Sequence, residues 1–394
     1  MDKNPKASPA VCSALREGGC SFRFRGISAL DRYFGLADLP FVFVETSADL
    51  QTLARLFGEL RFPGPELADC AVSGGGRDWY FFCAGADAAE NRFSDGFEPG
   101  ASFGILDFFL DPQTGRYFDP FGVYPLLRRM RRRVPEDILR RNRGFSAERN
   151  RFLLDAALIL SRYAPFLSAS TEICAEAEAL DAERPGTELQ RIMLTAILLS
   201  PGPDRGLELL RAAGFLADNW PELAQLDDAE HSKEFHPEGN AWKHTLETFR
   251  YRKASGPDSA GSLHDIRLSL GLLLHDTGKP LALSSGRNRF DGHAEIGAAA
   301  ARRFLDRLEF PSELINDVCY LVKNHMLPAA LPRLPLSRTK AIMDSRLFPV
   351  LLELYRCDES SSFKGLDQYY KSSAAYRRFL RLRKNPYRKE GKET

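Results

Sequence analysis

The stretch 263–274 constrains the fold most, because it is so apolar that a helix formed there is expected to be buried at the centre of a domain. It ends in His275-Asp276, and the next four residues, Thr-Gly-Lys-Pro, mark a break in the chain. An ionisable pair at the inner end of a buried helix costs free energy unless it is paired or holds a metal. The sequence therefore predicts a helical domain built around a polar centre.

The histidines are distributed unevenly, because all seven lie between residues 231 and 325 of the 394-residue chain. His325 continues the apolar face of a predicted helix that begins at residue 312, and Asp358 continues that of a predicted helix at 347–358. A single inward histidine is usually a satisfied core residue, and a single inward aspartate is usually a cap or an ion-pair member. Several such residues together favour a metal site, because imidazole and carboxylate suit divalent transition metals.

A second His-Asp pair, His264-Asp265, lies at the polar start of the same buried helix, and we expect it at the surface. Context separates the two pairs, because only His275-Asp276 follows a run of leucines. Near His275-Asp276, the ammonium of Lys279 would be available to stabilise negative charge on a phosphate.

The order and spacing of these residues resemble the HD superfamily of metal phosphohydrolases. The resemblance implies that Asp276 and Lys279 act in catalysis, with Asp276 bridging two ions and Lys279 facing the phosphate. It also implies one or two divalent ions, of which Mn, Ni, Co, Fe and Mg are all candidates. The implied metal ligands are His244, His275, Asp276, His293, His325 and Asp358.

Segments around residues 207–216, 220–223, 234–245 and 355–358 are similar to bacterial tRNA CCA-adding enzymes and their poly(A) polymerase relatives. The resemblance implies an α+β architecture. Its parts are a nucleotidyltransferase-like α/β head at 1–125, a helical neck and body at 126–230, an all-α HD domain at 231–370 and a basic tail at 371–394. His236 lies in the junction, where a hydrogen bond at a helix entry and a role in the site are equally plausible.

The head is predicted to have the fold without the catalysis. Strand-like runs at 41–44, 79–83, 104–110 and 116–118 and a helical pattern at 48–60 support an α/β segment. The family's head carries a Gly-Gly turn, an Arg-Asp pair and a strand with Asp-x-Asp. Here Gly26 stands alone in the turn, and Phe41 and Phe43 take the places of the two carboxylates. A phenylalanine cannot ligate Mg²⁺.

The formal net charge is +1, so only local clusters could indicate a nucleic-acid partner. One arginine cluster has two equally supported interpretations, an RNA-contacting patch and a solvated helix face balanced by acids. Its candidate RNA contacts are Arg128, Arg129, Arg132 and Arg140. We expect no membrane segment, and the seven cysteines form no CxxC pair, which suggests reduced thiols in a cytoplasmic protein.

The predicted function is metal-dependent hydrolysis of a phosphoester on a nucleotide or an RNA end, with tRNA as a further candidate partner. Two alternatives stay open. One is an active tRNA CCA nucleotidyltransferase or poly(A) polymerase. The other is a non-enzymatic RNA-binding protein that keeps a structural metal site.

Overall fold

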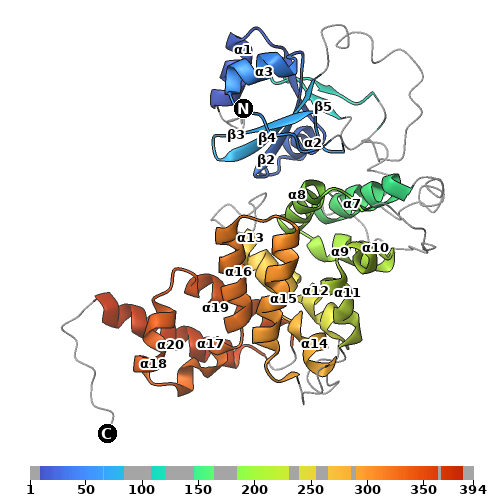
Figure 1. Ribbon diagram of the computed structural model, residues 1–394. Coiled ribbons are helices and arrows are strands. Elements are labelled where there is room, and N and C mark those ends of the chain that lie inside the picture. Colours follow the sequence, from blue (N-terminus) through green and yellow to red (C-terminus); the bar gives the residue numbers. More distant parts are fainter. Residues whose placement is uncertain are drawn as a thin grey trace. The chain divides into compact units, whose positions relative to one another are not determined.

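The structure is a computed structural model that describes residues 9–64, 66–83, 108–120, 122, 146–163, 184–229, 239–253, 265–284, 290–362 and 365–384. The chain forms two compact units (Figure 1). Unit 1 contains Met1–Asp218 and Ala254–Leu263, and unit 2 contains Asn219–Lys253 and His264–Thr394. The fold class is α+β, as predicted. The finer boundaries predicted at residues 125, 230 and 370 stay predictions.

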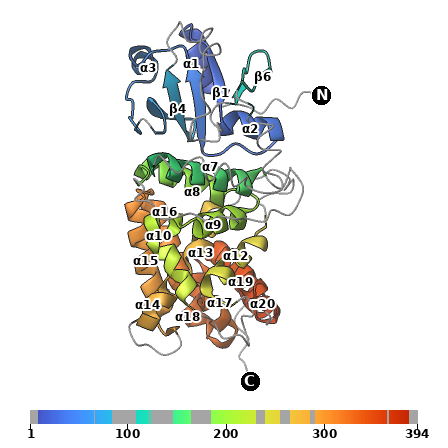
Figure 2. The ribbon, with the colours of Figure 1, turned by 90° about the vertical axis from the view of Figure 1, so that its right-hand side faces the viewer.

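Unit 1 contains a sheet in the order β3-β4-β2-β1-β5-β6. Strands β1, β4 and β6 of this sheet are labelled in Figure 2. Its strands are β1 (Phe22–Arg25), β2 (Phe41–Thr46), β3 (Cys70–Gly74), β4 (Arg77–Cys83), β5 (Phe109–Leu110) and β6 (Tyr117–Phe118). Strands β2 and β4 are parallel, and every other neighbouring pair is antiparallel. The predicted strands at 41–44, 79–83 and 116–118 are confirmed, and the described end of 104–110 forms β5.

Strands β1 and β3 were not predicted, because each is too short for a clear signal. In β1 the two phenylalanines are buried and the two arginines are half-buried, as strand alternation requires. Strand β3 is identified through its pairing with β4, in which Cys70 lies opposite Phe81. Tertiary pairing therefore defined both strands.

Helices pack on both faces of the sheet in unit 1. The helices that precede α10 in the described part of the chain are α1 (Pro9–Glu17), α2 (Ile27–Phe34), α3 (Leu50–Phe57), α7 (Ser146–Arg162), α8 (Thr187–Leu198) and α9 (Pro203–Ala212), of which α9 packs on α7 and α8. On β4, the ring of Phe81 stacks on Phe57 of α3, while the hydroxyl of the next residue back, Tyr80, donates to Glu188 of α8. Successive strand residues point to opposite faces, so α3 and α8 pack on different sides.

Unit 2 is helical throughout its described part. After α10 (Phe215–Asn219), which begins in unit 1, come α11 (Pro221–Ala224), η3 (Gln225–Asp228) and α12 (Ala241–Arg250). The remaining elements are α13 (Ile266–Leu274), α14 (Gly278–Ser284), α15 (His293–Arg307), α16 (Ser312–Asn324), α17 (Leu327–Ala330), η5 (Leu331–Arg333), α18 (Leu336–Met343), α19 (Phe348–Ser360) and α20 (Asp367–Lys384). Among the described residues, no helix has both the length and the apolar character that crossing a bilayer requires.

Helix α13 is the buried centre of unit 2, as predicted. All seven residues from 268 to 274 are buried, and the helix packs against α12, α16 and α19. Gly271 allows this close packing, because a Cβ there would lie 2.8 Å from Leu354 of α19. Figure 1 shows α15 and α16 side by side, and they make extensive contacts. The candidate site residues come from these helices and their ends.

Candidate metal centre

All six predicted ligands lie together in unit 2. They form two groups, in each of which the candidate ligand atoms lie within 4.8 Å of one another. The groups are His244 with His275 and Asp358, and Asp276 with His293 and His325. All but Asp358 are buried, and Asp358 is half-buried. Side chains separated by up to 114 residues in the sequence therefore converge on one small volume.

Helix ends deliver most of these side chains. His275 is the C-cap of α13, His325 is the C-cap of α16, and His293 is the first residue of α15. His244 lies in the first half of α12, a helix capped by Asn240, whose side chain accepts from the backbone N–H of Lys243. At a helix end the chain leaves its apolar stripe, so a polar group can enter the interior without breaking the helix.

The four imidazoles share one arrangement. In three of them Nδ1 donates to a backbone carbonyl oxygen three residues earlier. These bonds run from His275 to Leu272 (2.8 Å), from His293 to Phe290 (2.9 Å) and from His325 to Val322 (2.7 Å). A carbonyl can only accept, so each Nδ1 carries the proton and each neutral ring has its lone pair on Nε2. The fourth, His244, has its Nδ1 3.2 Å from the hydroxyl of Ser361.

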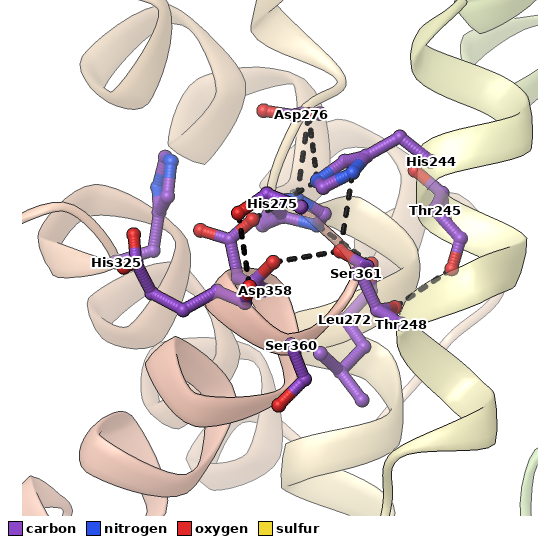
Figure 3. A network of polar contacts seen from close by, with 12 residues as sticks. His244, Thr245, Thr248, Leu272, His275, Asp276, His325, Asp358, Ser360 and Ser361 are labelled. Carbon is purple, nitrogen blue, oxygen red and sulfur yellow. Dashed lines mark hydrogen bonds and ion pairs between the residues drawn. The ribbon is translucent and has the colours of Figure 1, made fainter. Parts of the chain in front are cut away.

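The Nε2 atoms face one another and the two carboxylates. Nε2 of His293 lies 3.2 Å from Nε2 of His325. Nε2 of His244 lies 2.9 Å from Asp358 Oδ1 (Figure 3). Nε2 of His275 is buried and makes no hydrogen bond of normal geometry. Lone pairs that face each other at such distances repel unless a proton or a metal ion lies between them. The donor set therefore fits divalent cations, with imidazole nitrogen and carboxylate oxygen as ligands.

Asp276 lies between the two groups. Its Oδ2 is 3.3 Å from Nε2 of His275 and 3.9 Å from Nε2 of His244, while its Oδ1 is 3.7 Å from Nε2 of His293. Lys279 donates to Asp276 Oδ2 at 2.6 Å, and its ammonium lies 5.5 Å from the ring centre of Phe290. The carboxylate of Asp276 thus faces both histidine groups and also accepts a hydrogen bond from the ammonium of Lys279.

The electrostatics of the site favour ionised carboxylates at Asp276 and Asp358 and neutral rings at His293 and His325. Burial by itself raises the pKa of Asp276, but the charges of His275 and Lys279 outweigh it, and the net pKa lies well below its usual value. Burial likewise opposes ionisation of Asp358, yet the hydrogen bond from His244 holds its pKa low. Burial lowers the pKa of His293, and it lowers that of His325 to about 4. These are the protonation states in which such groups ligate metals.

A close approach of backbones fixes Asp276 against His293. The Cβ of an alanine at Gly278 would lie 2.0 Å from the carbonyl oxygen of His293 and 2.5 Å from the backbone nitrogen of Gly297. Only glycine allows α14 to begin this close to α15. The Thr-Gly-Lys break that marked the sequence motif is therefore also the packing contact that assembles the site.

The second His-Asp pair is described only at Asp265. Asp265 is the N-cap of α13, and its side chain accepts from the backbone N–H of Arg267 at 2.8 Å. The predicted surface position of His264 falls outside the described residues and stays a prediction. Other candidates also fall outside the described residues, namely His236, Arg128, Arg129, Arg132 and Arg140.

The predicted carboxylate positions of the head lie on β2 and hold buried rings. The side chains of Phe41 and Phe43 are 6% and 1% exposed, and the two ring centres are 5.7 Å apart. The ring of Phe43 also contacts Tyr80 at 5.4 Å. Glu45, two residues further on the same face, pairs with Arg23 at 2.5 Å. This part of the sheet is filled with aromatic side chains, and the charge of Glu45 is balanced by Arg23.

Sequence inspection missed Ser361 and the backbone carbonyl of Phe290. Ser361 contacts His244, and Phe290 accepts the Nδ1 proton of His293 while its own backbone has a positive φ of 63°. A positive φ is strained for an aromatic residue and often marks a functional segment. Neither signal is visible in a linear pattern, because a serine after an aspartate and a phenylalanine in a loop are common.

Comparison with known proteins agrees with this geometry. Residues 241–347 match the HD domain family. The chain is 39% identical over 172 residues to the CC-adding tRNA nucleotidyltransferase of Thermus thermophilus, an alignment that covers 42% of this chain and 36% of the relative. It is 34% identical over 221 residues to the multifunctional CCA protein of Halorhodospira halophila, covering 54% and 49%. The chain thus aligns with half or less of the length of these relatives.

Among solved structures, the CCA-adding enzyme of Bacillus stearothermophilus in complex with CTP aligns with 97% of this chain and 84% of its own. Its TM-score is 0.45 and its sequence identity is 16%. Residues 241–347 thus match the HD domain family, and about half of the chain is similar in sequence to bacterial CCA-adding tRNA nucleotidyltransferases.

Proposed function

We propose that unit 2 binds one or two divalent ions through His244, His275, Asp276, His293, His325 and Asp358 and hydrolyses a phosphoester. The observation that carries the proposal is the shared orientation of the imidazoles. In three of them Nδ1 donates to a backbone carbonyl, and in all four Nε2 turns toward the two aspartates. Such second contacts fix the tautomer of metal-ligating histidines. A purely structural polar cluster would pair every Nε2 with a protein group, whereas here Nε2 of His275 is buried without a hydrogen bond and those of His293 and His325 face each other.

The chemistry follows from the groups that surround this volume. A divalent ion supplies Lewis acidity and lowers the pKa of water toward neutrality. Asp276 faces both groups of histidines, so its two oxygens can serve two ions or orient one. The ammonium of Lys279, 2.6 Å from Asp276, holds that carboxylate and adds positive charge where a phosphate would approach. Imidazole-rich sets favour Mn, Fe, Co or Ni over Mg.

The proposed substrate is a nucleotide or the phosphoester at an RNA end, with tRNA as one source of such an end. The printed names of the relatives support this substrate class, because they describe tRNA nucleotidyltransferases. Assays should therefore begin with 2′,3′-cyclic nucleotides, 2′-nucleotides and RNA with a terminal phosphate. Activity that depends on added Mn, Ni or Co and is lost with a chelator is expected. A protein that binds no divalent metal on elemental analysis and hydrolyses none of these substrates contradicts the proposal.

We further propose that the nucleotidyltransferase site of unit 1 is inactive. Support comes from Phe41 and Phe43, whose buried rings cannot ligate Mg²⁺. The nearby charges are neutralised, because Asp31 binds Arg162 and Asp38 pairs with Arg32. The test is incorporation of labelled CTP or ATP into tRNA that lacks its 3′ end, with Mg²⁺ present. Robust incorporation would establish the alternative, an active CCA-adding enzyme or poly(A) polymerase.

A non-enzymatic RNA-binding protein with a structural metal is the remaining alternative. The ammonium of Lys279 disfavours it, because a structural site has no use for an ammonium beside its shared carboxylate. Measuring RNA binding and hydrolysis on the same Asp276→Asn sample separates the two. Loss of hydrolysis with retained RNA binding supports the enzyme.

A further inference from the structure

Three consecutive serines at the end of α19 make equivalent hydrogen bonds to the backbone. The hydroxyl of Ser360 donates to Arg356 O at 2.7 Å, that of Ser361 to Asp358 O at 2.6 Å and that of Ser362 to Glu359 O at 2.9 Å. Ser361 differs from its neighbours in one respect, because its Oγ also lies 3.2 Å from Nδ1 of His244. Figure 3 shows Ser361 beside His244, with Ser360 turned away from the site.

The hydroxyl of Ser361 has one proton, and the 2.6 Å bond to the carbonyl of Asp358 uses it. The oxygen therefore faces His244 with a lone pair. When Nε2 of His244 ligates an ion, the proton of the neutral ring lies on Nδ1, and Ser361 Oγ, 3.2 Å away, is placed to accept it. Nε2 points at Asp358 Oδ1, 2.9 Å away, and therefore toward the candidate metal centre.

We propose that Ser361 is a positioning residue that holds the proton of His244 on Nδ1 and thereby presents Nε2 to the candidate metal centre. This role rests on the proposed function, because it is the ion on Nε2 that leaves the ring proton on Nδ1.

Ser361 is informative because the other histidines cannot be tested in this way. Their Nδ1 atoms donate to backbone carbonyls, which no side-chain substitution removes. His244 is on α12, and its Nδ1 acceptor is a side chain 117 residues further along the chain. Ser361 is 7% exposed, so water would not freely replace its oxygen. A serine hydroxyl at the end of α19 thus serves the function that carbonyl oxygens serve elsewhere in the site.

The first experiment uses the full chain saturated with Zn²⁺, a diamagnetic ion that imidazole and carboxylate groups bind, with ¹⁵N-labelled histidine and NMR detection of ring nitrogens. His244 is assigned from the signals lost in His244→Gln. In the wild type we expect a protonated Nδ1 whose hydrogen exchanges slowly. In Ser361→Ala that exchange should become about tenfold faster, the equivalent of one hydrogen bond. Ser360→Ala, which removes a similar hydroxyl-to-carbonyl bond, should leave it unchanged. An unprotonated Nδ1 in the wild type, or the same exchange rate in Ser361→Ala, overturns the proposal.

The second experiment measures Mn²⁺ affinity by calorimetry on the same proteins. Loss of a contact of this kind costs about 10- to 100-fold in metal affinity. Ser361→Ala should show that loss, and Ser360→Ala should bind as the wild type does. Equal affinity in all three overturns the positioning role, even if Ser361→Ala lowers thermal stability. If the wild type binds no divalent metal, it is the proposed function that fails, and this outcome is distinct from equal affinity in all three proteins.

Discussion

Strand β2 of unit 1 and the end of helix α13 of unit 2 are both deeply buried, yet the carboxylates beside them have different kinds of partner. In the described part of unit 1 the buried acids pair with arginines. Glu45 pairs with Arg23, and Asp31 accepts two hydrogen bonds from Arg162 at 2.6 and 2.7 Å. In unit 2, Asp276 and Asp358 face imidazole nitrogens, and only Lys279 among the paired groups there is a permanent cation.

We infer that the carboxylates paired with arginines in unit 1 contribute to folding, whereas the carboxylates that face imidazoles in unit 2 are available to bind an ion. A carboxylate matched by a guanidinium is already neutralised and gains little from an added ion. A cluster of carboxylates and neutral imidazoles lacks positive charge, and a divalent ion supplies it. The following experiments test this contrast between the two units.

The largest effect is expected from Asp276→Ala. It removes the one carboxylate that faces both histidine groups, so hydrolysis should fall by about a thousandfold or more, and the protein should lose bound metal. Turnover and elemental analysis are the measurements, and circular dichroism checks folding. Asp265→Ala is the matched control, because Asp265 belongs to the other His-Asp pair and only caps α13. Equal losses in both variants would remove the distinction between the pairs.

Breaking the buried ion pair of unit 1 should affect stability and leave metal binding intact. Arg162→Met strands the carboxylate of Asp31 in the interior, which should lower the free energy of unfolding by about 3–5 kcal/mol. Arg383→Met removes an exposed pair with Asp344 and should cost less than about 1 kcal/mol. Denaturant titration and Mn²⁺ calorimetry check both results. Reduced metal affinity in folded Arg162→Met would show that the buried ion pair of unit 1 also affects metal binding in unit 2.

Gly278→Ala should damage the assembly of the site without removing any charged group. Its Cβ would collide with the backbone of His293 at 2.0 Å, and overpacking of this kind costs about 3 kcal/mol. Metal affinity should fall with stability, because α14 and α15 separate. Gly186→Ala serves as control, since its nearest atom would be 3.5 Å away. Thermal unfolding and calorimetry decide the outcome, and normal metal binding by Gly278→Ala would argue against this packing contact.

Added metal should stabilise one unit selectively. At a free concentration 100 times Kd, a bound ion contributes about 2.7 kcal/mol to the state that binds it. Hydrogen exchange should slow in α13, α16 and α19, which surround the site, and stay the same in β2 and β4 of unit 1. Exchange that slows equally in the sheet would mean that the ion binds elsewhere or that the units unfold together.

Much of the fold was accessible from local patterns. The apolar run before His275 predicted the central helix, and the aromatic-rich segments predicted β2 and β4, because burial on all sides leaves a continuous signal. Strands β1 and β3 were missed, since four or five residues carry too little pattern and take their conformation from the strands beside them.

The sequence by itself determined which six side chains belong together, because their order and spacing form a motif with few random matches. Only the tertiary structure decided how they face one another. The placement of each imidazole proton depends on a carbonyl or hydroxyl oxygen close by in space, such as Ser361 beside His244. Close approach of α14 to α15 at Gly278 depends on two backbones that meet through packing. Such contacts are set by three-dimensional geometry, and a linear pattern contains no record of them.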